Sequence, residues 1–590
     1  NVYDKRGLLV SETMRVDAST TITNTYAYDA RGNKIRVVEA AGLPEQRTTT
    51  YDYYLNDLVK TKTGDAVPVQ NADNLGTTNK PVVESYQYDL RGNLIKVTDA
   101  NNASSFFFYD DLDRKSAEIS AVGTLTTRTF DASGNIKSQR VYATPVSLPG
   151  TPGGTPPAGT GTYRETRLNY DRNNRLTSTL VMGVQYGEYV GGNFVYGTTD
   201  ITTFTSYDAA GNAITQTDGR GNVTYTYYNK LGQKTAQVDA ANYLTAWDLD
   251  HNGNVKKETR FATQLIGTPG TSTAPAAPAA SNDDRLTTFL YDLAGRRVSE
   301  SRLNLAASSL DANGVLSTSS AASTITYTYN GLGQVLQKTE ANGDYTKQDY
   351  DLLGRVKHTE QNAFVDYRGV TVTPSTDMTY NGLNEVVITT VHGDGTASAP
   401  DRVTTNAYGK GGRLTSVTDS TNFATSYFYD NAGNVVAQTY GRLKANGTTE
   451  SDGVFITYDA AGRETSRKSG VLSDGTWTYG DTTDEYYDAF GEVIARGTNS
   501  GGNIANAQEF AEYDNAGHVW RTNFNDGVTK AYVYDRSGNA TMLFQGTGTV
   551  NLKGFANLSA IFADASGTIT KTISVFDKRN QLTDTIQPAS

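Results

Sequence analysis

One short pattern recurs along the whole chain and limits what the chain can fold into. Its unit is an aromatic residue, Asp, two variable residues, Gly and then a polar residue. In the most regular runs the copies lie 21 residues apart, as at residues 88, 109 and 130. A fixed period of this kind indicates units that stack on their neighbours, not several separate globular domains. The 21 copies begin at Tyr3, Tyr28, Tyr51, Tyr88, Tyr109, Phe130, Tyr170, Tyr207, Tyr228, Leu249, Tyr291, Tyr329, Tyr350, Tyr380, Tyr408, Tyr429, Tyr458, Tyr487, Tyr513, Tyr534 and Phe576.

The fifth column of the pattern indicates a tight turn. It holds Gly in 16 copies, and its exceptions are Asp113, Asn174, Asn384, Asn580 and Leu55. Gly, Asn and Asp are the residues that adopt left-handed backbone dihedrals at low cost. Asp at the start of a type I turn, followed by a left-handed residue, is typical of a three-residue β-hairpin loop. Each copy therefore predicts a strand that ends at the aromatic residue, turns and begins again.

A second turn is predicted about halfway between copies. Asp follows Thr and precedes Asn or Gly in residues 98–101, 217–222 and 418–422. Two turns in each 21-residue unit leave two strands of roughly six to eight residues, which is a normal strand length. No apolar spacing of 3.6 residues is sustained, so we expect very little helix. The predicted fold class is all-β, a repetitive antiparallel β strip of hairpin repeats.

Six well-preserved copies supply the residues that we expect to matter most, as structural turn residues. Aromatic residues two apart, such as Tyr86 and Tyr88, share a strand face, and we expect Tyr to lie beside Tyr in neighbouring copies. The predicted turn residues are Tyr28, Asp29, Gly32, Tyr88, Asp89, Gly92, Tyr207, Asp208, Gly211, Tyr350, Asp351, Gly354, Tyr429, Asp430, Gly433, Tyr534, Asp535 and Gly538.

Composition excludes several classes of function. The net charge is -11, which argues against a nucleic-acid partner. The chain has no cysteine, so it has neither disulfides nor thiolate metal sites. No apolar run is long enough for a membrane-spanning helix. The four histidines, His251, His358, His392 and His518, form no sequence motif for a metal, and no Gly-x-Ser-x-Gly nucleophile elbow occurs. We expect no enzymatic activity, no cofactor and no metal.

The motif Tyr-Asp-x-x-Gly-Asn/Arg with its 21-residue period resembles the YD repeats of the Rhs family. That family includes bacterial Rhs proteins, the B and C shell components of insecticidal toxin complexes, wall-associated repeat proteins and the teneurin YD shell. The resemblance implies that the strip spirals into a hollow tube or shell, often around a toxin made by the same chain. Two departures stand out: the chain has no Asp-Pro dipeptide for self-cleavage, and its last copy lies within 15 residues of Ser590.

We predict one continuous array over residues 1–590, as a fragment or unit of a longer protein. Stretches rich in Pro, Gly and Ala interrupt it at 141–162 and 261–281, with a weaker interruption at 441–453. Proline cannot donate to a strand ladder, so we expect these stretches to be loop insertions that leave the sheet.

The leading functional prediction is a structural scaffold, a secreted or cell-surface bacterial tube or shell wall that encloses or displays cargo. One alternative is the shell portion of an Rhs-type toxin whose toxin domain lies outside this chain. The other is an adhesin-like array that binds glycans or a partner surface. The expected partners are further copies of the chain or continuing repeats, enclosed cargo or surface glycans.

Overall fold

The computed structural model describes residues 1–587 apart from 72–73, 311–312, 397–398, 444–448, 474–475, 547–550, 565 and 567. It divides into two compact units, each made of stretches that are distant in the sequence. Unit 1 contains Asn1–Thr127, Tyr142–Thr162 and Tyr345–Gln508, and unit 2 contains Arg128–Val141, Tyr163–Asp344 and Glu509–Ser590. Each unit therefore combines an early and a late stretch of the array.

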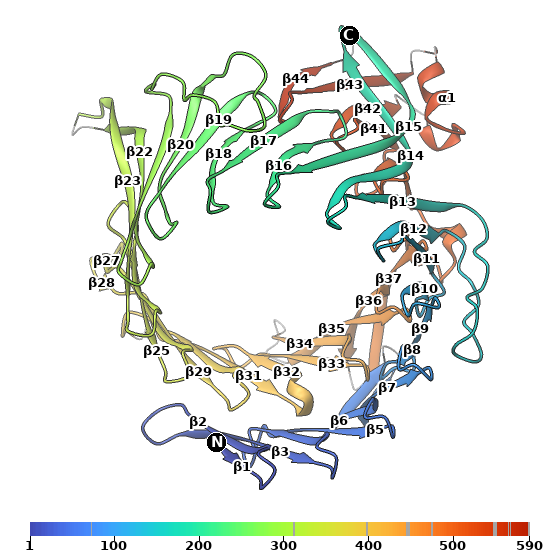
Figure 1. The fold of residues 1–590 in the computed structure, drawn as a ribbon. Helices are drawn as coiled ribbons and strands as arrows, with labels where there is room; N and C mark the ends of the chain where they lie inside the picture. Colours follow the sequence, from blue (N-terminus) through green and yellow to red (C-terminus); the bar gives the residue numbers. More distant parts are fainter. Residues whose placement is uncertain are drawn as a thin grey trace. The chain divides into compact units, whose positions relative to one another are not determined.

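The early stretch of unit 1 consists of β-strands that follow one another in close succession (Figure 1). They are β1 (Val2–Tyr3), β2 (Leu9–Arg15), β3 (Thr21–Tyr28), β4 (Lys34–Glu39), β5 (Arg47–Tyr53), β6 (Val59–Asn71), β7 (Asn74–Tyr88), β8 (Leu94–Thr98), β9 (Ser104–Tyr109) and β10 (Lys115–Ile119). The boundary between the units falls inside β11 (Leu125–Phe130) and β12 (Ile136–Tyr142).

The late stretch of unit 1 contains strands and two short 3-10 helices. They are β25 (Tyr345–Tyr350), β26 (Val356–Gln361), β27 (Phe364–Val365), β28 (Thr371–Val372), β29 (Ser375–Tyr380), β30 (Val386–Val391), β31 (Arg402–Tyr408), η1 (Lys410–Gly412), β32 (Leu414–Thr418), β33 (Ala424–Tyr429), β34 (Val435–Leu443), β35 (Thr449–Tyr458), β36 (Glu464–Ser473), β37 (Thr476–Tyr487), β38 (Val493–Thr498) and η2 (Ile504–Asn506).

Unit 2 is built in the same way. Its strands are β13 (Tyr163–Tyr170), β14 (Leu176–Val190), β15 (Asn193–Tyr207), β16 (Ala213–Thr217), β17 (Val223–Tyr228), β18 (Lys234–Val238), β19 (Tyr243–Leu249), β20 (Val255–Gln264), β21 (Arg285–Tyr291), β22 (Arg297–Leu310), β23 (Leu316–Tyr329), β24 (Val335–Thr339), β39 (Glu509–Tyr513), β40 (Val519–Thr522), β41 (Lys530–Tyr534), β42 (Ala540–Gly546), β43 (Ile569–Phe576) and β44 (Leu582–Ile586). Two helices, η3 (Leu552–Gly554) and α1 (Leu558–Ala563), lie between β42 and β43.

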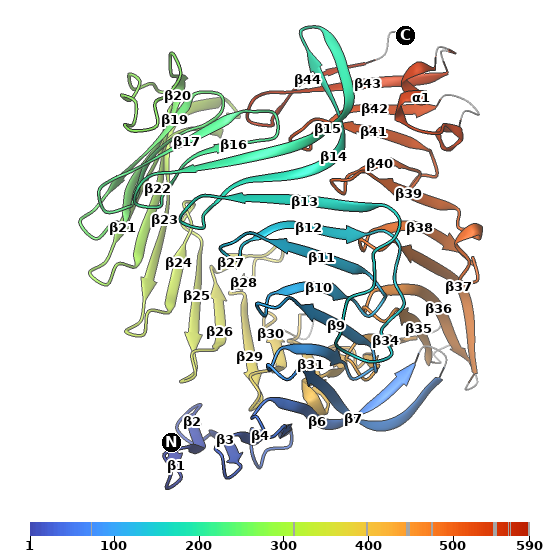
Figure 2. The ribbon, with the colours of Figure 1, turned by 45° about the vertical axis from the view of Figure 1, so that its right-hand side comes forward.

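Neighbouring strands pair antiparallel in chain order, which confirms the predicted all-β class. Figure 2 shows this order for β9 and β10 in unit 1 and for β39 to β43 in unit 2. The two-residue hairpin β27–β28 is an excursion, since β26 pairs directly with β29. Over the described residues helix is confined to short segments, and α1 has six residues. The sequence did not predict α1, because its apolar face is only Leu558, Ile561 and Phe562, too short to stand out as a sustained helical period; Asn557 caps the helix, and Leu558 and Ile561 pack in a local core.

The insertions differ from their predicted form. Strand β12 extends to Tyr142 and β20 to Gln264, so each loop begins later than expected. The third insertion, 441–453, is largely strand, because β34 and β35 remain paired as far as Leu443 and Thr449. Its residues 444–448 lie outside the described part of the chain. A β-hairpin extension satisfies its own backbone hydrogen bonds, and this stretch has no proline to prevent that.

The two proline-rich loops fold back onto the sheet and cover apolar side chains. In unit 1, Tyr142 and Val146 pack against a buried group formed by Phe106, Phe108, Ala117, Ile119 and Leu125, which we call the first cluster. In unit 2, Phe261 and Leu265 pack with Tyr225 against Tyr227, Ala236, Val238 and Leu244, the second cluster. Each loop is anchored by one backbone bond at 2.8 Å, from Val146 to Gly123 or from Leu265 to Asn242. The loops are therefore covers for a thin core.

Candidate functional site

Every repeat ends a strand in the same turn, and the copy at Tyr88 shows its parts. The backbone N–H of Gly92 donates to the carbonyl of Asp89 at 3.1 Å, and that of Asp89 donates to the carbonyl of Asn93 at 2.9 Å. The Asp89 carboxylate accepts the backbone N–H groups of Arg91 and Asn93 at 2.9 and 2.8 Å. Burial alone would raise the pKa of Asp89, but these hydrogen bonds outweigh it and hold the pKa below its usual value. Gly92 has φ of 92°, the left-handed region.

The other predicted turn residues lie in turns of the same form. The fifth-column φ angles are 96° at Gly32, 98° at Gly211, 84° at Gly354, 101° at Gly433 and 85° at Gly538. The carboxylates of Asp29, Asp208, Asp351, Asp430 and Asp535 accept the backbone N–H groups of Asn33, Asn212, Arg355, Asn434 and Asn539.

The halfway turns have this geometry too. Asp99 donates its backbone N–H to the carbonyl of Ala103, and Asn102 sits at φ of 66°. The 21-residue unit is therefore two hairpins closed by one type of turn.

One copy lies two residues from its predicted place. Strand β5 ends at Tyr53 instead of Tyr51, and the backbone N–H of Asp57 donates to the carbonyl of Tyr54. Asp57 then occupies the fifth column, with φ of 64°. The predicted start at Tyr51 was wrong because Tyr51-Asp52 imitates the motif. The corrected register removes Leu55, the one fifth-column exception that left-handed geometry did not explain.

The first-column tyrosines bond to the backbone of the preceding copy. The hydroxyl of Tyr109 donates at 2.9 Å to the carbonyl of Leu94, which lies beyond the last ladder pair of β8 and β9, Lys96 with Phe106. The equivalent carbonyl, six places after the preceding first-column residue, accepts from Tyr28, Tyr53, Tyr207, Tyr228, Tyr291, Tyr329, Tyr380, Tyr408, Tyr429, Tyr458 and Tyr534.

Two of the predicted tyrosines make further contacts. The hydroxyl of Tyr350 donates to the side chain of Gln348, and the ring of Tyr88 packs edge-on against Tyr54. Burial raises the pKa of Tyr534 to about 12.

The sixth column joins each turn to the next. The Arg175 Nε donates to its own turn residue Asp171 at 2.7 Å, and its Nη1 donates to the carbonyl of Asp208 in the next turn at 3.0 Å. Its guanidinium also lies 4.6 Å from the ring centre of Tyr207. Arg296, Arg355 and Arg463 repeat these contacts with the turns that follow them. In these copies the side chain that packs on the first-column tyrosine is therefore the arginine of the preceding copy, whereas we expected another tyrosine there.

The fifth-column exceptions are acceptors for this sixth column. Asp57, Asp113, Asn174, Asn384 and Asn580 each accept a side-chain hydrogen bond, from Asn33, Asn93, Asn135, Arg355 and Asn539 respectively. Asn and Asp therefore do two things at these positions. They adopt the left-handed conformation and also bind the preceding turn, which Gly cannot do.

The third column, variable in sequence, makes contacts between the two stretches of a unit. Because alternate turns of an antiparallel strip lie at opposite ends of its strands, repeat turns form one rim and halfway turns form the other. In unit 1, repeat turns of the late stretch bond to the opposite rim of the early stretch. Leu352 N donates to the carbonyl of Val16, Gly382 N to the Glu45 carboxylate, and Asn431 Nδ2 to the carbonyl of Ala100, while Ala489 O accepts from Thr124 Oγ1.

Unit 2 has an equivalent line of contacts. Asn515 Nδ2 donates to the carbonyl of Gly183 at 3.0 Å, and Arg536 forms a two-pronged ion pair with Glu188 at 2.8 and 3.1 Å. Burial alone would raise the pKa of Glu188, but the hydrogen bonds from Arg536 lower it overall. A Cβ on Gly219 would lie 1.9 Å from the carbonyl oxygen of Arg536, so only glycine fits there. We call these two rim-to-rim lines the seams.

Two of the four histidines come together in unit 1, which the sequence did not reveal. Asp377 accepts from His358 Nδ1 at 2.5 Å and from His392 Nε2 at 2.7 Å. The hydrogen bond to Asp377 raises the pKa of His392, and the two imidazoles lower the pKa of Asp377. Within the described residues no three His, Cys, Asp or Glu side chains are grouped so that they could hold a metal. That the chain binds no metal remains a prediction.

A family match agrees with the repeat geometry. The RHS Repeat family model matches residues 207–242 in unit 2 and 410–449 in unit 1. Both segments contain the repeat turn and the halfway turn described above. This chain is a YD/Rhs-repeat protein. Among curated proteins, none matches it.

The solved structures similar to this YD/Rhs-repeat chain are distant. The crystal structure of TcdB2-TccC3-TEV is 12% identical with a TM-score of 0.35, over 96% of this chain and 31% of that one. The Photorhabdus luminescens Tc holotoxin pore is also 12% identical, with a TM-score of 0.26, over 94% and 31%. A porin-like protein from Bacteroides uniformis is 13% identical with a TM-score of 0.18, over 33% and 88%. The chain thus spans about a third of the first of these structures.

None of the helices in the described ranges has the length and apolar character needed to cross a bilayer.

Proposed function

We propose that this YD/Rhs-repeat chain is a structural wall, secreted or displayed on a bacterial surface, that encloses or presents cargo. The observation that carries the proposal is the third column, whose side chains and backbone bond one stretch of strip to the opposite rim of another in both units. A strip that closes its own rims in this way forms a continuous two-dimensional surface.

The seams suit a wall because their bonds are spread along the rims. Most are single hydrogen bonds to backbone carbonyls, each worth only about 0.5–1.5 kcal/mol. The stronger contact between Arg536 and Glu188 is partly buried, with the Glu188 side chain 13% exposed. Because many weak bonds act together, losing one leaves the surface joined. Further copies of the chain, or continuing repeats, would extend the same surface.

The recurrence of the turn residues favours a non-enzymatic role. An active site needs one convergent group of side chains, whereas Tyr, Asp and Gly here serve the same turn in every copy. Their hydrogen bonds are all used within or between turns, as in the copy at Tyr88. We therefore propose that the chain has no catalytic activity of its own.

The test is a substitution that disturbs the unit 2 seam and leaves the charged residues Arg536 and Glu188 unchanged. Gly219→Ala places a methyl group against the Arg536 carbonyl and should push the two rims apart locally, at this point of the unit 2 seam. Hydrogen exchange followed by mass spectrometry should then show faster exchange in residues 183–190 and 534–541 and unchanged exchange in unit 1. The matched control is Gly331→Ala in the same unit, where a Cβ meets nothing within 4 Å. Equal exchange in both variants would contradict the wall proposal.

A further inference from the structure

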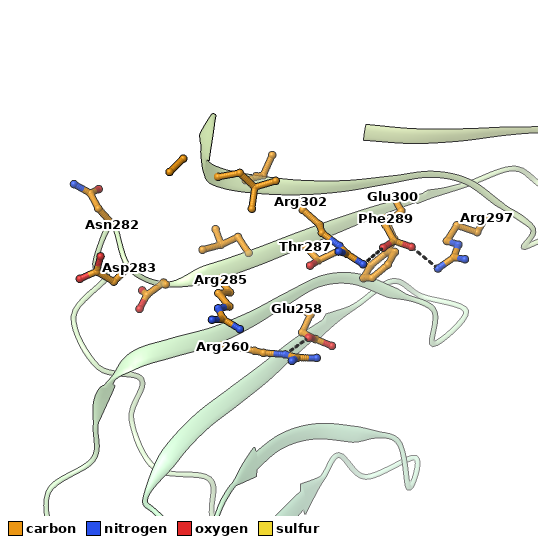
Figure 3. Close-up of a pocket in the computed structure, with 15 residues that line it drawn as sticks. Glu258, Arg260, Asn282, Asp283, Arg285, Thr287, Phe289, Arg297, Glu300 and Arg302 are labelled. Atoms are coloured by element: carbon orange, nitrogen blue, oxygen red, sulfur yellow. Dashed lines mark hydrogen bonds and ion pairs between the residues drawn. The ribbon is translucent and has the colours of Figure 1, made fainter. Parts of the chain in front are cut away.

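A groove of about 790 Å³ lies on strands β20, β21 and β22 of unit 2 (Figure 3). Its volume falls within the usual range of small-ligand sites, roughly 300–1,000 Å³. No turn or seam residue described above lines it. Its lining combines four arginines, several carboxylates, one aromatic ring and aliphatic side chains, including Arg285, Arg302, Glu258, Asp283, Phe289 and Leu303.

Strand register places the polar side chains in rows across the groove. Arg260 of β20 lies directly opposite Arg285 of β21. In the next row Glu258 faces Thr287, which in turn faces Arg302 of β22. Residues directly opposite in antiparallel strands project to the same face, so these side chains form one surface.

Three of the arginines have a carboxylate partner and Arg285 has none. Arg260 bonds Glu258 at 2.6 Å, while Glu300 takes Arg297 at 2.8 Å and Arg302 at 3.6 Å. Figure 3 draws Arg285 next to Arg260, with no dashed line to it. Within the described part of the chain its guanidinium makes neither a hydrogen bond nor an ion pair.

The charge of Arg285 is unfavourably placed beside its neighbours in the groove. Like charges directly opposite on neighbouring strands are destabilising, and the Glu258 carboxylate offsets only the charge of Arg260. A guanidinium presents a planar fork of donors that matches a carboxylate in two-pronged geometry. An anionic group bound at Arg285 would therefore satisfy these donors and relieve the repulsion from Arg260.

We propose that this groove binds an oligosaccharide that carries carboxylate groups, with one carboxylate on Arg285. Hydroxyl groups of a sugar need donors and acceptors side by side, and Thr287, Asn282 and Glu258 provide both. The ring of Phe289, over which the Arg297 guanidinium lies 5.8 Å from the ring centre, adds an apolar surface that a sugar ring could contact beside this arginine.

The carboxylates in the groove favour this ligand over other polyanions. Glu258, Glu300 and Asp283 line the same space as the arginines and would repel a backbone of closely spaced phosphates. A sugar acid separates its charges by neutral, hydroxyl-rich rings. An acidic peptide has carboxylates but few hydroxyls, so Thr287 and Glu258 would gain little from it.

The experiment is isothermal titration calorimetry on the full chain with hexagalacturonate, with the neutral hexagalactose of equal length and with poly-L-glutamate. We expect binding of the hexagalacturonate alone. Arg285→Gln should weaken it at least tenfold, since charged hydrogen bonds are lost, and Arg285→Lys should weaken it less. The control Arg172→Gln removes another exposed arginine of unit 2 and should change affinity less than twofold.

A second measurement separates binding from folding. Because Arg285→Gln removes the like-charge pair, the melting temperature of the unliganded chain should stay equal or rise. Absence of hexagalacturonate binding, equal binding by wild type and Arg285→Gln, or preferred binding of poly-L-glutamate would each overturn the proposal. The wall proposal stands apart from it, because Gly219→Ala lies outside the groove and should leave hexagalacturonate affinity unchanged.

Discussion

The first and second clusters are two versions of one packing arrangement, built with different side chains. Each residue of the second cluster lies 119 residues after its counterpart in the first, so that Phe108 corresponds to Tyr227, Ile119 to Val238 and Val146 to Leu265. The anchoring bonds correspond too, both at 2.8 Å. Val238 is smaller than Ile119, while Leu265 is larger than Val146. Total volume is thus kept while individual residues change, which is how packed cores tolerate substitution.

The two clusters differ in the side-chain hydrogen bonds that hold their loops, and one of these bonds comes from a buried ring. Tyr227 is 4% exposed, and its hydroxyl donates to the carbonyl of Gly270 in the covering loop at 2.7 Å. Phe108 has no hydroxyl and needs no such partner. The second loop is therefore held by a side-chain bond that the first lacks, and the comparison can be tested position by position.

The largest expected effect comes from emptying the clusters. Ile119→Ala should destabilise the first cluster by about 2–5 kcal/mol, because Ile119 is completely buried. Val238→Ala removes one methylene fewer and should cost about 1 kcal/mol less. Opening free energies from amide exchange in β10 and β18 would measure both. A larger loss for Val238→Ala would show that the two clusters do not pack alike.

A smaller effect is expected at the matched turns of Gly92 and Gly211, which have φ of 92° and 98°. Val at either position forces a β-branched residue into the left-handed region and should cost at least about 1 kcal/mol. Asn should cost much less at both positions, since Asn174 and Asn384 already adopt this conformation. Thermal denaturation of the four variants provides the comparison. Equal losses for Val and Asn would contradict the turn geometry.

The hydroxyl of Tyr227 should contribute less again. Tyr227→Phe removes its bond to Gly270 and should cost about 0.5–1.5 kcal/mol, seen as faster proteolysis within 265–281. The reciprocal change, Phe108→Tyr, adds a hydroxyl among buried apolar side chains and should also destabilise. A stabilising Phe108→Tyr would mean that the first loop offers an acceptor equivalent to Gly270.

The smallest expected effect is a difference between two matched turns in how low pH changes their amide exchange. The hydrogen bond from Arg114 is the main reason why the pKa of Asp110 lies below its usual value. A carboxylate with a depressed pKa stabilises the fold above its unfolded pKa of about 4, and this contribution is lost as pH falls through the folded pKa. Its counterpart 119 residues later is Asn229, which does not titrate. Below pH 4, exchange of the Arg114 amide should accelerate more than that of Gln233, after correction for intrinsic rates. Parallel changes would rule out Asp110 as the cause.

The turns were predictable from the sequence because their requirements are local. Left-handed Gly92 and the carboxylate of Asp89 act within five residues, so each copy repeats the same signal. The 119-residue correspondence was also present in the sequence, since residues 88–146 align with 207–265 without a gap. The pattern of the 21-residue unit does not by itself reveal this longer correspondence, because 119 is not a multiple of 21.

The seams could not be predicted in this way. Asn431 bonds Ala100, and the two residues are 331 positions apart in the chain. Both residues lie in variable columns of the repeat. The side chain needed there depends on the residue that it contacts across the seam, so it does not recur with the 21-residue period. The free guanidinium of Arg285 was hidden for a related reason, because its neighbours Arg260 and Arg302 come from other strands.

The tyrosine hydroxyls give the repeat a direction. Each first-column hydroxyl that donates to a backbone carbonyl in the bonds given above reaches back to the copy before it, as Tyr109 does to Leu94 and Tyr429 to Leu414. Peeling a stretch from its later end frees one carbonyl at a time, and water readily solvates that carbonyl. Peeling from the earlier end removes the acceptor carbonyl from a tyrosine whose ring is still packed in the sheet, so its hydroxyl is left without a hydrogen-bond partner. A pulling force should therefore meet different resistance at the two ends of a stretch, with the higher resistance at the earlier end.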